Sequence, residues 1–146
     1  MIAVVQRVSR SRVLVKGNVV GEIGRGVNIL LGLLKGDDAS RLEHLTAKIA
    51  NLRIFPDEEG RMNRSLIDVG ASALAISQFT LAANLKRGRR PSFDSAMPPA
   101  EAKELYERFC TEMEKIVSVE RGVFGAMMEV EILNDGPVTL ILDSRE

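Results

Sequence analysis

The sequence predicts an α+β fold in which a mainly antiparallel, barrel-like sheet is covered by two helices. The N-terminal part consists of short apolar segments separated by glycines, and the chain ends in strand-like alternation. Between these parts, two stretches carry apolar residues at helical spacing. Because no repeat, low-complexity tract or linker divides the 146 residues, we expect one domain spanning 1–146.

The N-terminal segments are predicted to form a meander of hairpins. They are Ile2–Val8, Val13–Val15, Val19–Ile23 and Val27–Leu34. Gly17-Asn18 and Gly24-Arg25-Gly26 lie between the later segments, and such pairs are typical of turns between strands. The order of these glycines differs from that of a dinucleotide-binding fingerprint, and no helix follows them directly.

Two amphipathic helices are predicted after this meander. The first spans 37–51, where apolar residues recur at spacings of three and four and Asp37, Asp38 and Ser40 are available as caps. The second begins at Pro98-Pro99, because proline is favoured in the first turn of a helix. Its apolar face carries Leu105, Phe109, Met113 and Ile116.

The remaining strands are predicted from short apolar runs. Residues 56–60 are rich in turn formers and predict a hairpin tip. Residues 73–81 form an apolar run with a polar end, which we interpret as a buried strand. Near the C-terminus, 128–133 alternates and 138–142 forms the last strand, with Asn134–Pro137 joining the two.

Composition and charge exclude several function classes. Twenty basic residues balance twenty acidic ones, so any contact with a polyanion must be local. One cysteine and one histidine are too few for a disulfide or a His/Cys zinc site, and we expect no metal and no other cofactor. The first apolar run, Ile2–Val5, is too short for a signal peptide or a membrane span. We therefore expect a cytoplasmic protein without a membrane partner.

Two segments are not explained by the fold alone. Ser77, Gln78 and Thr80 lie together at the polar end of a buried strand, where each needs a hydrogen-bond partner. Taken alone, such residues usually satisfy neighbouring backbone groups. Gly136-Pro137 lies at a strand entrance, and sequence alone favours a trans turn there, although a cis bond would direct consecutive carbonyls rigidly.

These two segments carry a resemblance to a known family. Ser77–Leu81 and Asn134–Thr139 resemble the two signature motifs of D-aminoacyl-tRNA deacylases, and further similar segments extend almost from end to end. The supporting segments are Ala3–Val8, Asn51–Phe55, Met62–Ser65, Gly88–Phe93 and Phe124–Ala126. Ala82–Asn84 and Met127 depart from the common pattern but leave both motifs intact.

The resemblance implies a homodimeric hydrolase that releases D-amino acids, and glycine, from mischarged tRNA. It implies that Gly136 and Pro137 of one subunit enter the site of the other as a cis element. Their carbonyls would hold the substrate amino group, so that an L side chain collides with the wall. Val138 and Thr139 belong to the same element, and Arg7 would orient its carbonyls. Without the resemblance, a surface ion pair is the simpler interpretation of Arg7.

The same resemblance implies a catalytic segment formed by Ser77, Gln78, Phe79 and Thr80. We favour backbone N–H groups near Phe79 and Thr80 as an oxyanion hole, with the ribose 2′-hydroxyl helping to activate water. The competing interpretation makes Thr80 a nucleophile, but the sequence marks no adjacent base. Phe79 and Phe124 either line an adenine pocket or belong to the core, and for Phe124 the sequence does not separate the two.

A basic loop is the candidate contact for the tRNA acceptor end. It contains Lys86, Arg87, Arg89 and Arg90, although such clusters are more often solvated loops. With 4% aromatic residues, the chain lacks a platform for stacking bases, so we expect it to read the charged end of tRNA. No DNA partner is expected. Two alternatives remain open, a non-catalytic RNA-binding barrel and a thiol hydrolase built on Cys110.

Overall fold

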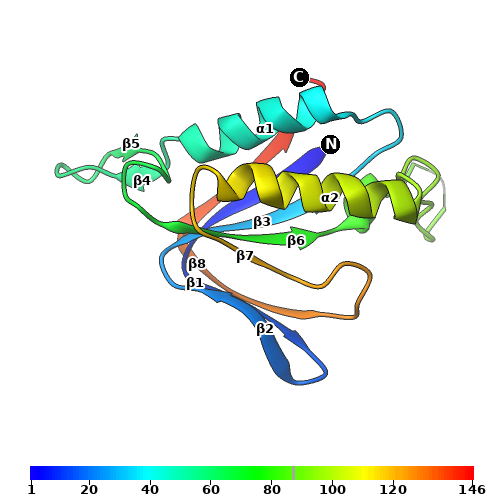
Figure 1. Ribbon diagram of the computed structural model, residues 1–146, viewed down its shortest axis with the longest axis horizontal. Coiled ribbons are helices and arrows are strands. Elements are labelled where there is room, and N and C mark those ends of the chain that lie inside the picture. The colour runs from blue at the N-terminus through cyan, green and yellow to red at the C-terminus, as the bar shows by residue number, and fades with distance from the viewer. Residues whose placement is uncertain (87) are drawn as a thin grey trace.

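The computed structural model describes residues 1–86 and 88–146 as a sheet with two helices lying side by side over one face (Figure 1). The strands of the main sheet are β1 (Ile2–Val15), β2 (Asn18–Ile23), β3 (Gly26–Gly32), β6 (Ser72–Ser77), β7 (Val119–Arg121) and β8 (Glu129–Asp143). A hairpin of β4 (Phe55–Pro56) and β5 (Met62–Arg64) forms a separate sheet. The helices are α1 (Ala39–Asn51), α2 (Pro99–Glu114) and the short 3₁₀ helix η1 (Phe79–Ala82).

The main sheet is mixed, which corrects the expectation of a mainly antiparallel one. Its order is β2-β1-β3-β6-β7, and β8 pairs with β1. β1 runs antiparallel to β2, β3 and β8, whereas β3 pairs in parallel with β6, and β6 with β7. The chain reaches β6 after α1 and reaches β7 after α2, and such long crossovers join parallel strands.

Side-chain alternation along the strands separates two apolar cores. From β3, Ile29 and Leu31 pack toward the helices, whereas Leu30 packs against the smaller core on the opposite face of the sheet. β6 contributes to both cores, with Ala75 in the first and Ile76 in the second. The prediction of a buried strand starting near residue 73 is therefore confirmed, because apolar side chains pack against both faces of β6.

The sheet curls into a nearly closed barrel where β2 approaches β7. A Cβ atom added to Gly21 of β2 would lie 2.5 Å from the carbonyl oxygen of Arg121 in β7. Real Cβ atoms do not come this close to a carbonyl, so the approach requires glycine. The expected barrel-like form of the sheet is thus confirmed.

Both predicted helices are confirmed. In α1 the Asp38 carboxylate accepts a hydrogen bond from the Arg41 amide at 2.9 Å, as an N-cap does. α2 begins at Pro99 and buries Phe109 and Met113, but Ile116 lies beyond its end and is exposed. No helix in the described residues is both long and apolar enough to cross a membrane.

Three strand boundaries differ from the predictions. The segments 2–8 and 13–15 are one continuous strand, β1, because both β8 and the β2/β3 pair extend along it. The segments 128–133 and 138–142 likewise belong to one strand, β8, whose register shifts between them. β7 was not predicted, since three residues are too short to show a pattern.

We expect Gly21→Ala to destabilise the protein by about 1–3 kcal/mol, because the added methyl group would push β2 away from β7. Gly24→Ala is the matched control, since its added Cβ would have no neighbour within 4 Å. Urea unfolding followed by circular dichroism measures both variants. Equal unfolding free energies for the two would show that the close approach of β2 and β7 does not constrain the fold.

Candidate functional site

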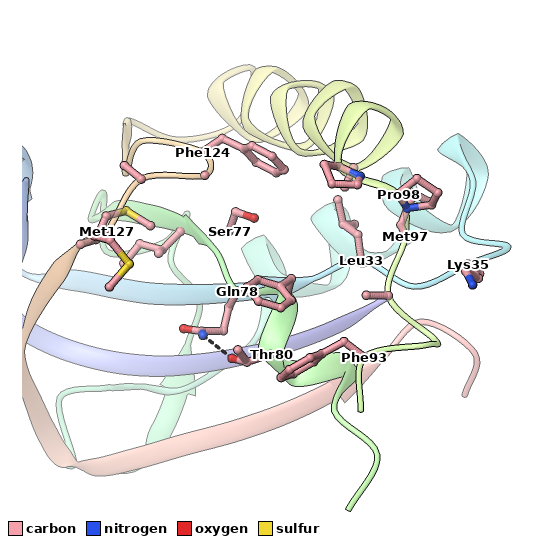
Figure 2. Close-up of a pocket in the computed structure, with 18 of the residues that line it drawn as sticks. Leu33, Lys35, Ser77, Gln78, Thr80, Phe93, Met97, Pro98, Phe124 and Met127 are labelled. Atoms are coloured by element: carbon pink, nitrogen blue, oxygen red, sulfur yellow. Dashed lines mark hydrogen bonds between the residues drawn. The ribbon is translucent and has the colours of Figure 1, made fainter. Parts of the chain in front are cut away.

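A cavity of about 900 Å³ lies at the end of β6, between the η1 turn and the N-terminal end of α2 (Figure 2). Its walls come from parts of the chain that are far apart in sequence. Ser77, Gln78, Phe79 and Thr80 form one wall, and residues 124–128 form another. The structure therefore brings the four predicted catalytic residues and Phe124 into one cavity.

The chain turns sharply where the sequence predicted a continuing strand. The Gln78 amide makes the last bond to β3, donating to the Leu31 carbonyl at 2.8 Å. The Leu81 amide then donates to the Gln78 carbonyl at 3.2 Å, which closes the 3₁₀ turn. The expected strand thus ends at Ser77 and not at Leu81, and the turn places Phe79 and Thr80 at the cavity.

The turn leaves several polar groups of the cavity-lining residues without a hydrogen-bond partner among the described residues. The Gln78 side-chain amide donates to the Thr80 hydroxyl oxygen at 2.5 Å (Figure 2). Within residues 1–86 and 88–146, the N–H groups of Phe79 and Thr80 donate to no acceptor, and the Ser77 hydroxyl makes no hydrogen bond. Two adjacent free N–H donors can stabilise negative charge on a carbonyl oxygen placed before them.

Aromatic side chains line the cavity on both sides. Phe79 is 58% exposed and meets Phe93 edge-on, with ring centroids 5.0 Å apart. On the opposite wall, half-buried Phe124 packs against Tyr106 of α2 at 5.8 Å. Phe124 is therefore both a cavity wall and a partner of the core. Such rings offer a flat apolar surface to a planar ligand.

The only cysteine does not reach the cavity. Cys110 is fully buried in α2, and burial raises the pKa of its thiol to about 11. Its neighbour Tyr106 donates from its hydroxyl to the Ala75 carbonyl at 2.9 Å, and burial also raises the pKa of this phenol. A buried, protonated thiol is a poor nucleophile, so the geometry argues against a hydrolase built on Cys110.

The second motif lies in an outward bulge of β8. Gln6 pairs with Thr139 and Val8 pairs with Asn134, so residues 135–138 face Arg7 alone on β1. Gly136 and Pro137 are exposed and joined by a cis peptide bond, and neither lines the cavity of their own chain. The structure therefore does not bring the two motifs together within one chain.

Arg7 and Asn134 hold this bulge in place. The Arg7 side chain is 11% exposed and donates to the carbonyls of Ile54 at 2.7 Å and Asp135 at 3.2 Å. It also forms an ion pair with the Asp135 carboxylate at 3.2 Å. The Asn134 amide, oriented with its nitrogen toward two carbonyls, donates to those of Arg7 and Val138 at 3.0 Å each.

Gly136 has no room for a side chain beneath Arg7. Its φ of +123° is a conformation that other residues rarely adopt. An added Cβ would lie 2.8 Å from the Arg7 guanidinium and 2.9 Å from the Val138 side chain. Arg7 thus makes an ion pair, as the simpler interpretation holds, and also packs directly against the Gly-Pro element.

Three of the four predicted tRNA-contact residues are exposed in the chain segment that leads to Phe93 at the cavity. Lys86, Arg89 and Arg90 are exposed, whereas Arg87 lies outside the described residues. Phe93, at the end of this loop, and Lys35 both line the cavity, but neither was singled out from the sequence. No pattern marked Lys35, while the position of Phe93 directly after the basic loop was a usable signal. Among the described residues, no three His, Cys, Asp or Glu side chains are grouped to hold a metal.

Known proteins similar to this chain match it over almost its whole length. The family model described as D-Tyr-tRNA(Tyr) deacylase matches residues 4–143. Proteins named D-aminoacyl-tRNA deacylase from Persephonella marina and Aquifex aeolicus are 59% and 54% identical, each over at least 99% of both chains.

Two solved structures share the fold. One, named c-Myc DNA Unwinding Element Binding Protein, is 43% identical over 98% of both chains, with a TM-score of 0.93. The other, described as a probable eukaryotic D-amino acid tRNA deacylase, is 20% identical with a TM-score of 0.83 over 97% of both chains, and supports the fold alone. The family model and the full-length identities place this chain in the D-Tyr-tRNA(Tyr) deacylase family, whose members are hydrolases acting on aminoacyl-tRNA.

Proposed function

We propose that this chain hydrolyses the ester bond of D-aminoacyl-tRNA, and of mischarged glycyl-tRNA, releasing the amino acid and free tRNA. Family membership supports the reaction class. The observation that carries the proposal is the largely apolar cavity at the end of β6, because its lining includes Phe79 and Thr80, whose N–H groups have no acceptor among the described residues. Its substrate is used in translation, so the setting is the cytoplasm.

The chemistry requires little from side chains. An aminoacyl ester is reactive, and the neighbouring ribose 2′-hydroxyl can help to activate water. The N–H groups of Phe79 and Thr80 would stabilise the oxyanion that forms when water attacks the ester carbonyl. Fixing the ester in front of these donors supplies much of the remaining acceleration through orientation. Gln78 shapes the turn that carries the donors, and Ser77 lines the cavity beside it.

The contacts of Thr80 favour a positioning role over a nucleophilic one. Its hydroxyl oxygen accepts the Gln78 amide, which cannot take up a proton. Among the described residues, no histidine or carboxylate hydrogen-bonds to this hydroxyl. A threonine without an adjacent base is a weak nucleophile. The hydroxyl can instead use its hydrogen to orient the ester or the attacking water.

Selection against L-aminoacyl groups is proposed to come from a partner subunit. Gly136 and Pro137 are exposed and do not line the cavity of their own chain, so a second copy would have to present them. Leu133 and Ile141, on the same strand, are 54% and 75% exposed, which supports an apolar contact between copies. β8 pairs only with β1 among the described strands, so its other edge carries no strand.

In this homodimer, the partner's main chain would bind the substrate amino group and leave no space for an L side chain. The Arg7 and Asn134 contacts hold residues 135–138 in place, so this segment would not move aside for an L side chain. Val138 and Thr139 complete the element, because Asn134 also accepts a hydrogen bond from the Thr139 hydroxyl at 2.9 Å. Phe124 and Phe79 would enclose the terminal adenine, and the basic loop would contact the phosphates.

The principal test compares D- and L-tyrosyl-tRNA as substrates of the wild-type protein. We expect rapid release of D-tyrosine and little release of L-tyrosine, because the site rejects the L side chain by steric exclusion. Release is measured with radiolabelled amino acid under single-turnover conditions. If tRNA binds but neither ester is cleaved faster than in buffer, the non-catalytic RNA-binding barrel becomes the better interpretation.

Thr80→Ala distinguishes the two mechanisms. We expect it to lower kcat by about tenfold or less, as loss of one orienting hydrogen bond does. Thr80→Ser is the matched control because it keeps the hydroxyl. Complete loss of turnover in Thr80→Ala with unchanged tRNA binding, together with retained activity in Thr80→Ser, would instead support an acyl-enzyme intermediate on Thr80.

Mixing two inactive variants tests the shared site. Ala126→Trp fills the cavity, and Pro137→Arg places a bulky cation on the exposed element. Co-expression should restore about one quarter of wild-type activity, because about half of the dimers are hybrids with one intact site. Each variant expressed alone is the control. A mixture as inactive as its components would show that each site is built within one chain.

A further inference from the structure

We propose that Phe93 is a positioning residue that couples the basic loop to the turn formed by Gln78, Phe79 and Thr80. The inference rests on the proposed function, because it concerns how contact with the tRNA backbone affects hydrolysis at the same site. Phe93 lies outside both signature motifs, Ser77–Leu81 and Asn134–Thr139, although it ends the supporting segment Gly88–Phe93. The structural basis is a chain of direct contacts from the loop to both ends of η1.

The base of the basic loop is clamped by one pair of residues. The Asn84 amide donates to the Ser92 carbonyl at 2.8 Å, and the Ser92 amide donates back to the Asn84 carbonyl at 3.2 Å. Lys86, Arg89 and Arg90 lie between these two residues and are exposed. Phosphates bound to the loop would therefore affect the residues that follow Ser92, because the Asn84–Ser92 pair connects them to the loop.

Those residues contact η1 at both of its ends. The Phe93 ring meets the Phe79 ring edge-on, at 5.0 Å between centroids and 63° between planes. The Ser95 hydroxyl donates to the carbonyl of Ala82, the last residue of η1, at 2.7 Å. The Ala96 amide donates to the Phe93 carbonyl at 2.9 Å, which makes 93–96 a compact turn. Residues 92–96 thus join the loop directly to the turn.

Phe79 transmits this contact to the reacting groups. Its own N–H and that of Thr80 are the two proposed oxyanion donors, so the Phe93 ring contact at one end of η1 and the Ser95 hydrogen bond at the other restrain the backbone that carries them. An oxyanion hole works only when its donors are held within hydrogen-bond distance of the developing charge. Phosphate contact at the loop would therefore raise kcat as well as affinity, since it steadies Phe93 against Phe79.

A double-mutant cycle with two substrates tests the coupling. The four proteins are the wild type, Phe93→Leu, the loop variant Lys86→Gln/Arg89→Gln/Arg90→Gln, and their combination. The substrates are D-tyrosyl-tRNA and D-tyrosyl-adenosine, which carries the same ester without phosphates. Because leucine keeps apolar bulk but has no ring, Phe93→Leu removes the edge contact, and Phe93→Tyr is the conservative control. Thermal unfolding of each protein checks that the fold is retained.

We expect the loop variant to lower kcat on D-tyrosyl-tRNA by about tenfold in the wild-type background, and to leave kcat unchanged in the Phe93→Leu background. Its effect on KM should persist in both backgrounds. In a plot of the logarithm of the tRNA-binding constant against the logarithm of the salt concentration, the slope should become less steep by about two. On D-tyrosyl-adenosine the loop variant should change neither constant. Phe93→Tyr should restore the kcat response to the loop.

Two results would overturn the inference in different ways. If both substrates are cleaved and the kcat effects of the loop and Phe93 variants on D-tyrosyl-tRNA multiply independently, Phe93 is only a cavity wall and the proposed hydrolysis stands. If the wild type cleaves neither substrate, the proposed function fails and the coupling fails with it.

Discussion

The pairing of β1 with three strands determines where every part of the candidate site lies. Its first half pairs with β3, its second half with β2, and β8 runs along both. β3 in turn fixes the parallel register of β6, whose end opens into the cavity. A slip of one residue along β1 would exchange the two faces of the sheet and mix the two cores. The same register also sets Arg7 opposite the bulge at 135–138.

The polar groups that the site offers belong mainly to the backbone. The N–H groups of Phe79 and Thr80 are held by a turn anchored on β3, and the bulge of β8 is held by Arg7 and Asn134. In the proposed mechanism, the side chains support the main chain and do not react. This arrangement suits a substrate whose bond is already reactive, because orientation and charge stabilisation then suffice. It is also consistent with the position of Cys110, which is buried away from the cavity.

The sequence predicted those features of the fold that depend on local patterns. The helices followed from apolar spacing and from Asp38 and the Pro98-Pro99 pair, and the barrel-like form followed from short strands with glycines between them. Patterns of this kind show which face of a strand is buried but not which strand lies beside it. The parallel pairs of β6, the continuity of β1 and the three-residue β7 therefore emerged only from the structure.

The site was predictable to a similar extent. The polar triplet Ser77, Gln78 and Thr80 was visible as an anomaly, whereas its role came from the resemblance to a family. The sharp turn after Ser77 was missed because polar and apolar residues alternate from Gln78 to Leu81, a pattern that is also typical of a strand. Phe93 and Lys35 were missed because their importance depends on packing across the cavity, and sequence spacing does not report such contacts.

The separation of the two motifs within one chain has a consequence for how the protein behaves when it is scarce. If each complete site needs residues from two copies, the fraction of complete sites follows mass action. Dilution below the dissociation constant of the dimer then separates the copies and leaves incomplete sites. Specific activity would then fall with enzyme concentration, although every molecule remains folded. The abundance of the protein would itself act as a control on its output.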